Sequence, residues 1–123
     1  HPRRGPARVM DRDRLYLGHV LEAIDAAQAF TADGHDAFMA DRKTQSAVIR
    51  QIEVIGEAVK RLSAATTGAA PQVPWRQIAG ARDRLIHGYF QVDLESVWAM
   101  VEQDLPVLKQ QVRHLLETGI DGA

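Results

Sequence analysis

The sequence predicts an all-α protein, an up-and-down four-helix bundle, from three observations. Apolar residues recur at helical spacing over four segments, no segment alternates as a strand does, and short turn-like stretches separate the segments. The chain has 123 residues, the size of one domain. We therefore expect a single core in which successive helices pack antiparallel, with one extra short helix and a kink in the last helix.

We expect this domain to span residues 10–118. Residues 1–9 show no apolar periodicity and precede Met10, so they are interpreted as a cloning remnant or a disordered leader. Residues 119–123 are interpreted as a tail. They are left out of the predicted core.

The composition is that of an ordinary globular protein, with 46% hydrophobic and 25% charged residues. The chain has no cysteine, which excludes disulfides, thiolate zinc sites and thiol catalysis, and is compatible with the cytoplasm, where we place the protein. No apolar run approaches the roughly 20 residues of a membrane span. A net charge of −1 does not indicate nucleic-acid binding, and the cations clustered in mid-chain form either a local basic face or a solvated surface.

The first helix is predicted from Asp11 to near Thr31, because apolar residues recur there at helical spacing. Asp33 and Gly34 then indicate a turn, and the apolar residues 37–39 favour a single helical turn. Asp41 is a suitable N-cap for a long second helix that should end near Ser63.

Two features of this second long helix permit two interpretations each. Gly56 lies in its apolar stripe and marks either a close helix crossing or a merely tolerated glycine. Glu53 and Glu57 either accept hydrogen bonds on the inner side or point to water, and solvation is the favoured interpretation.

Residues 66–72 are small and polar and are predicted as a loop. Pro74 then suits the first turn of a third helix, which should run through Leu85 and end at Gly88 in a left-handed C-cap. Asp93 is a suitable N-cap for the last helix, in which Pro106 predicts a kink near residues 102–105. The apolar stripe of this helix is broad enough for a dimer face as well as a core.

Residues 81–90 gather the reactive side chains, because Arg82, His87 and Tyr89 form an R-x4-H-x-Y pattern. On an ideal helix Arg82 and His87 lie about 140° apart, so they do not share a face. Asp83 precedes His87 by one helical turn and is predicted to orient its imidazole. A helix end at Gly88 would also raise the pKa of His87 toward neutrality through the helix dipole.

An arginine beside a histidine, without a metal-ligand cluster, favours chemistry on a phosphodiester. RNA supplies its own nucleophile, the 2′-hydroxyl, so such a site needs neither a metal nor a protein nucleophile. The remaining histidines are scattered, and no metal site is predicted. Taken alone, these residues are a weak signal and also permit a capping histidine, a surface arginine that pairs with Asp or Glu, and a half-packed tyrosine.

A longer pattern surrounds this stretch. Residues 54–60 read Val-Ile-Gly-Glu-Ala-Val-Lys, residues 74–80 read Pro-Trp-Arg-Gln-Ile-Ala-Gly, and residues 92–95 with Trp98 follow the motif. Asp-Arg-Leu-Tyr-Leu near Asp13 and Asp-Leu-Pro at 104–106 belong to the same pattern. From Met10 to about Leu116 the chain thus resembles the HepT-like toxins of the HEPN superfamily.

The resemblance implies a homodimeric, metal-independent endoribonuclease that cleaves tRNA or mRNA as the toxin of a type VII toxin–antitoxin system. It implies catalytic roles for Arg82 and His87, with Asp83 supporting them, and a cleft lined by the motifs of both subunits. It also implies an MntA-like minimal nucleotidyltransferase as antitoxin, which attaches AMP to Tyr89. Arg76 and Arg84 are further candidate RNA contacts.

Two other functions remain open at this point. The first is a non-catalytic helical dimer that binds a nucleotide or a nucleotidyltransferase partner through Arg82 and His87. The second is a structural subunit of a stable nucleotidyltransferase complex that acts by sequestration, with Tyr89 at the interface.

Overall fold

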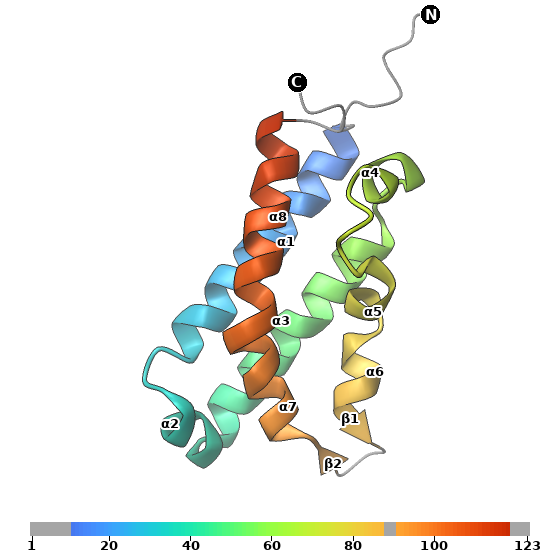
Figure 1. The fold of residues 1–123 in the computed structure, drawn as a ribbon. Helices are drawn as coiled ribbons and strands as arrows, with labels where there is room; N and C mark the ends of the chain where they lie inside the picture. The colour runs from blue at the N-terminus through green and yellow to red at the C-terminus, as the bar shows by residue number, and fades with distance from the viewer. Residues whose placement is uncertain (1–10, 88–90, 119–123) are drawn as a thin grey trace, which may run out of the picture.

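The computed structural model describes residues 11–87 and 91–118, and these form the predicted all-α fold (Figure 1). None of the helices in these two ranges is long and apolar enough to cross a membrane. The elements are α1 (Asp11–Phe30), α2 (His35–Ala40), α3 (Arg42–Lys60), α4 (Ala64–Ala69), α5 (Trp75–Ala79), α6 (Ala81–Leu85), β1 (Ile86–His87), β2 (Gln91–Val92), α7 (Leu94–Ala99), the π-helix η1 (Met100–Asp104) and α8 (Leu105–Thr118).

The bundle consists of α1, α3, the run of α7, η1 and α8, and the shorter helices α5 and α6 (Figure 1). Helix α1 packs against α3 and α8, while α5 and α6 pack against the other side of α3. The buried side chains of α1, α3 and α8 meet in one apolar core. Because α3 touches both α1 and the α5–α6 segment, it is the central helix of the fold.

The first half of the chain follows the sequence predictions closely. Helix α1 ends at Phe30, and Gly34 makes the following turn with a φ of 99°, a value that favours glycine. Asp41 caps α3, as predicted, since its carboxylate accepts hydrogen bonds from the Lys43 amide and the Thr44 hydroxyl. Helix α3 ends at Lys60, three residues before the predicted end.

The third helix was predicted wrongly. It is broken at Gly80 into α5 and α6, and it ends at Leu85 instead of Gly88 because Ile86 is already extended and pairs with Val92. An antiparallel pair of strands follows, in which Ile86 faces Val92 and His87 faces Gln91. The predicted loop at 66–72 also contains helix α4, whose N-cap is Ser63.

The last helical run is irregular just before Pro106, at the place where a kink was predicted. Asp93 caps α7, as predicted, by accepting hydrogen bonds from the Ser96 amide and hydroxyl. The run then passes through the π-helix η1 before α8 begins at Leu105. Pro106 cannot donate a backbone hydrogen bond, and a π-helical turn is one way in which a helix accommodates such a gap.

A buried carboxylate fastens the start of α1 to the start of α4. The buried Asp13 accepts hydrogen bonds from the Ser63 amide at 3.1 Å, the Ser63 hydroxyl at 2.6 Å and the Thr66 hydroxyl. Burial raises the pKa of Asp13, but these hydrogen bonds outweigh burial, so the pKa lies below its ordinary value of 3.8. The ionised form of Asp13 therefore stabilises the fold.

Gly56 lies at a close helix crossing, so the first of its two interpretations is confirmed and the second, a merely tolerated glycine, is wrong. A Cβ atom at Gly56 would lie 3.0 Å from the carbonyl oxygen of Ala79 and 3.4 Å from that of Ile78. Only a residue without a side chain lets α5 approach α3 so closely. The approach sets the position of α6, which continues directly from α5.

We expect Gly56→Ala to lower the free energy of unfolding by about 1–2 kcal/mol, because the new methyl group meets backbone that cannot rotate away. Gly18→Ala is the matched control, since a Cβ at Gly18, in α1, has no neighbour within 4 Å. It should raise the free energy of unfolding by about 1 kcal/mol through helix propensity. Urea unfolding measures both, and equal stabilisation by the two changes would contradict the close crossing.

Asp13→Asn should destabilise the protein by about 2 kcal/mol at pH 7, since it removes an ionised acceptor of three hydrogen bonds. A depressed pKa gives stability that is complete above the ordinary pKa and is lost as the pH falls through the folded-state pKa. The difference between wild type and Asp13→Asn should therefore shrink below about pH 3.8. Urea unfolding at pH 7 and pH 3, with the exposed Asp33→Asn as control, tests this dependence.

Candidate active site

Arg82, the first residue of the predicted motif, lies on α6 and is held by a carboxylate from α3. Its Nε atom donates a charge-assisted hydrogen bond to Oε2 of Glu53. Half of the Arg82 side chain is exposed, against 26% for Glu53. The guanidinium therefore faces solvent while its inner edge is anchored.

This ion pair lies in a polar cleft of about 360 Å³ between α3 and the α5–α6 segment. Oε1 of Glu53 lies 3.5 Å from Nη1 of Arg50, and Nζ of Lys60 lies 3.2 Å from Oε2 of Glu57. Each of the two glutamates on α3 is thus paired with a cation. Its six ionic side chains are Arg50, Glu53, Glu57, Lys60, Arg82 and Asp83.

The structure removes the basis for the predicted pairing of Asp83 with His87. That pairing needs one helix through both residues, but α6 ends at Leu85 and His87 lies in β1. The argument that a helix end at Gly88 raises the pKa of His87 fails for the same reason. Asp83 is 85% exposed, and its Oδ1 lies 4.0 Å from Nη1 of Arg82, so it contacts the arginine only weakly.

A β-hairpin carries His87 and joins the end of α6 to the start of α7. His87 is paired with Gln91, and the Asp93 amide donates to the Leu85 carbonyl at 2.9 Å, which closes the hairpin at its base. Gly88 and Tyr89 lie outside the described residues. The role predicted for Tyr89 stays a prediction.

A second contact, which the sequence did not reveal, holds the start of α7. Nε2 of His35, on α2, lies 2.9 Å from Oε1 of Glu95, on α7, and its ring packs edge-on against Trp98. The hydrogen bonds to Glu95, and then to Asp36, raise the pKa of His35 above 6.5. Because α7 directly follows β2, this contact supports the hairpin that carries His87.

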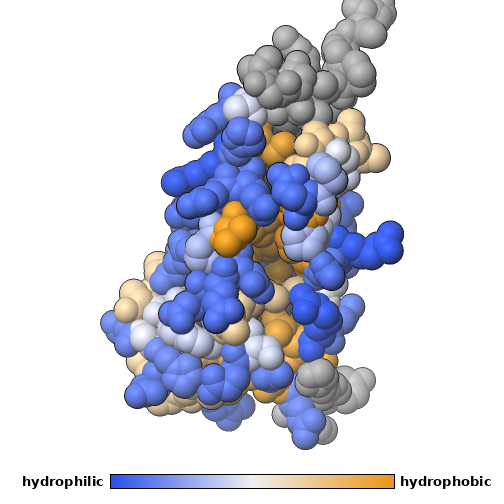
Figure 2. Space-filling model, in the orientation of Figure 1, coloured by the Kyte–Doolittle hydropathy of each residue, from blue (hydrophilic) through white to orange (hydrophobic). Residues whose placement is uncertain are grey.

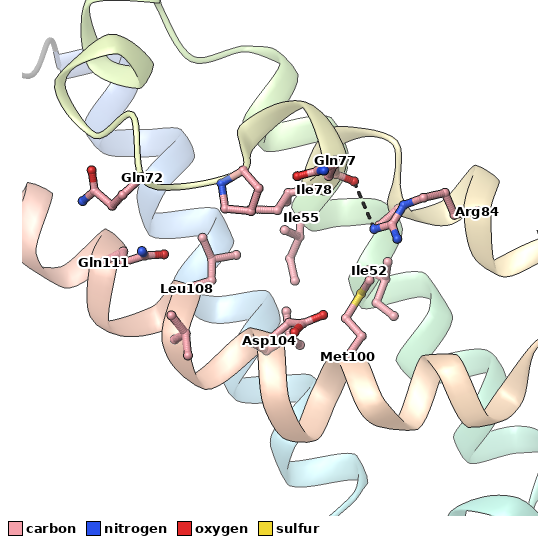
Figure 3. A pocket seen from close by; sticks show the side chains of 14 residues that line it. Ile52, Ile55, Gln72, Gln77, Ile78, Arg84, Met100, Asp104, Leu108 and Gln111 are labelled. Carbon is pink, nitrogen blue, oxygen red and sulfur yellow. Dashed lines mark hydrogen bonds between the residues drawn. The ribbon is translucent and has the colours of Figure 1, made fainter.

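Arg84 and Arg76, the two weaker candidates, do not join the Arg82 cleft. Arg76 is exposed on α5. Arg84 lies over a separate groove, where its Nη2 donates to the Gln77 carbonyl at 3.4 Å (Figure 3). Their contact with RNA stays a prediction.

This groove is apolar and runs between α8 and the α5–α6 segment, where Figure 2 shows apolar atoms at the bottom of a hollow. Its volume is about 450 Å³, and Ile52, Ile78, Met100 and Leu108 are among its lining residues. Arg84 and Asp104 come from opposite walls (Figure 3). Val107, on α8 at its edge, is 55% exposed.

Glu53 is the functional candidate that sequence reasoning missed. Solvation was the favoured interpretation of Glu53 and Glu57, and it was wrong for Glu53, which accepts from Arg82. The available signal was the position of Glu53 beside the buried Ile52 and one turn before Gly56, at the crossing itself. Among residues 11–87 and 91–118, no three His, Cys, Asp or Glu side chains form a group that would hold a metal ion.

Comparison with known proteins gives consistent matches. The model of a family described as "Ribonuclease HepT-like" matches residues 20–115. A "Probable ribonuclease HepT" from Thermococcus cleftensis is 43% identical over 101 residues, which are 81% of this chain and 92% of the relative. A "Putative RNase" from Caldanaerobacter subterraneus is 35% identical over 109 residues, which are 88% of this chain and 97% of the relative.

One longer relative differs in extent. A "Gamma-glutamylcyclotransferase and putative RNase" from Methanocaldococcus jannaschii is 40% identical over 105 residues, 85% of this chain. The match covers 47% of that relative, so the chain spans about half of its length. No solved structure matches the chain.

Proposed function

This chain belongs to the HepT-like ribonuclease family, and from that premise we propose that it is a toxin of a type VII toxin–antitoxin system. Its activity is the metal-independent cleavage of RNA, either tRNA or mRNA, in the cytoplasm. The observation that carries the proposal is the exposed and anchored guanidinium of Arg82, five residues before His87.

The chemistry follows from these two side chains. The RNA 2′-hydroxyl loses its proton to a base and attacks the adjacent phosphorus, the bond from phosphorus to the 5′ oxygen breaks, and that oxygen receives a proton. The products are a 2′,3′-cyclic phosphate and a 5′-hydroxyl. The imidazole of His87 moves a proton in this sequence, and Arg82 stabilises the charge that develops on the phosphate oxygens.

We place the homodimer contact at the apolar groove. A two-fold axis makes such an interface self-complementary, so each copy presents both the hollow and the exposed Val107 beside it. Arg84 and Asp104 both line the groove, so its rim offers both signs of charge for contacts between two copies. In a dimer formed there, α6 of each copy lies at the interface, because Ala81 and Arg84 line the groove.

A nucleotidyltransferase antitoxin of the MntA type is the proposed partner, and Tyr89 the residue that it modifies with AMP. Tyr89 follows His87 by two residues in the sequence. AMP attached there carries a phosphodiester charge that repels the phosphates of RNA. The alternative function is a non-catalytic dimer that binds a nucleotide or this partner through Arg82, and the same cleft supports it.

Purified protein is expected to cleave total RNA in the presence of EDTA. Arg82→Ala and His87→Ala should each lower the cleavage rate by at least about a hundredfold, because each removes a group that acts in the transition state. Gel analysis of the RNA and of its 2′,3′-cyclic phosphate ends measures this activity. Cleavage that is equal in all three proteins, or that EDTA abolishes, would contradict the mechanism.

An RNA-binding measurement on the same proteins tests the alternative function. RNA binding without cleavage by any form, weakened by Arg82→Ala, would favour the binding module.

The proposed dimer contact is tested at Val107. Val107→Glu should run as a monomer in size-exclusion chromatography, since it would bury an unpaired charge in the interface, and it should lose cleavage. The exposed Leu15→Glu, on α1, is the matched control and should stay dimeric.

Incubation with the partner nucleotidyltransferase and ATP should increase the intact mass by one or more AMP units and abolish RNA cleavage. Tyr89→Phe should keep its cleavage activity and show no increase in mass, because it lacks the phenolic oxygen that accepts AMP. An unmodified wild-type mass in an inactive complex would instead indicate sequestration.

A further inference from the structure

The contact between Glu53 and Arg82 joins two helices that are otherwise held together by apolar packing and by the close approach at Gly56. Arg82 is the first polar residue of α6, and Glu53 lies one turn before Gly56 on α3. The hydrogen bond therefore lies beside the point where the backbone of α5 comes close to α3. An arginine anchored there has a defined position relative to the whole bundle.

The hydrogen bond uses only one edge of the guanidinium. An arginine has five N–H donors, of which Nε carries one and the two terminal nitrogens carry four. Within residues 11–87 and 91–118, Nε is the only atom of the Arg82 side chain that makes a hydrogen bond. Nη1 makes only a long ionic contact, 4.0 Å from Oδ1 of Asp83. The terminal edge, which binds a phosphate with two parallel hydrogen bonds, is left for a ligand.

Glu53 is itself held in place. Its second oxygen, Oε1, lies 3.5 Å from Nη1 of Arg50, so the carboxylate lies between two arginines. Among the six ionic side chains of the cleft, Glu53 is also the least exposed, at 26%. A carboxylate that is partly buried and held from both sides loses little further entropy when it orients Arg82.

Asp83 does not supply this anchor. Its side chain is 85% exposed, and the helix that would have joined it to His87 ends at Leu85. Glu57, one turn beyond Glu53, pairs with Lys60 and is 65% exposed. Of these three carboxylates, only Glu53 meets the inner edge of Arg82.

We propose that Glu53 is a positioning residue for RNA cleavage, which anchors Nε of Arg82 so that the terminal edge of the guanidinium meets the scissile phosphate. The inference rests on the proposed ribonuclease function and assigns to that site a residue from outside the R-x4-H motif. Glu53 does not touch the reacting atoms, because as a carboxylate it would repel the phosphate. It acts through the geometry of Arg82.

If Glu53 has this role, its substitution should lower kcat without raising KM. Glu53→Ala removes a negative charge from the cleft, so RNA binding should stay equal or become tighter, and KM should not rise. The unanchored Arg82 would no longer meet the transition state correctly, and kcat should fall about 10- to 100-fold. Glu53→Gln keeps an oxygen that accepts from Nε and should stay within about threefold of the wild-type kcat.

The experiment measures kcat and KM on a fluorogenic RNA oligonucleotide, and the melting temperature, for wild type, Glu53→Ala, Glu53→Gln and Arg82→Ala. Glu22→Ala, which makes the same charge change at an exposed position of α1, is the control and should leave kcat unchanged. A lower kcat without a higher KM in Glu53→Ala, with rescue in Glu53→Gln, supports the proposal.

Three results would overturn it. The first is a kcat of Glu53→Ala within twofold of wild type while Arg82→Ala is inactive, which would leave the proposed function intact. The second is a kcat that falls together with the melting temperature and is not rescued by Glu53→Gln, which indicates a structural role. The third is wild-type protein that cleaves no RNA, which overturns the proposed function as well. The Arg82 Nε–H resonance in NMR spectra, compared with that of Glu53→Ala, then shows separately whether the contact exists.

Discussion

The close approach of α5 to α3 at Gly56 is the constraint on which the candidate site depends. The carbonyl oxygen of Ala79 lies 3.0 Å from the position that a Cβ at Gly56 would take, so a side chain there would prevent the α5–α6 segment from lying this close to α3. One turn earlier on α3, Glu53 then comes within reach of Arg82. A residue without chemistry of its own thereby sets the distance between the two charged residues that define the cleft.

Most of the fold was predictable, because it rests on local rules. Helical periodicity located α1, α3 and the last run, while Asp41 and Asp93 were correctly identified as N-caps from their position before each run. The prediction failed where tertiary contacts decide the backbone. The sequence of residues 81–90 does not indicate that Ile86 is extended, because that conformation depends on its pairing with Val92 across the hairpin.

The site was predictable in its residue types but not in its geometry. The pattern of Arg82, His87 and Tyr89 pointed to phosphodiester chemistry, and the family match places the chain among ribonucleases. The helix arithmetic that paired Asp83 with His87 was sound for a helix, and it failed because the helix stops at Leu85. Glu53 was missed because its partner is 29 residues away in the sequence, and no spacing rule reaches that far.

The balance of charge in the cleft bears on how such a site would be switched off. Three cations, Arg50, Lys60 and Arg82, face three anions, Glu53, Glu57 and Asp83, so the described residues of the cleft carry no net charge. RNA would be held by the placement of individual groups instead of by a general positive field. In a neutral cleft a single added phosphodiester makes the local charge negative, whereas a strongly basic cleft would stay attractive to RNA. The weak overall charge of the chain, which at first argued against an RNA substrate, thus suits a ribonuclease that is neutralised by adding a few anionic groups.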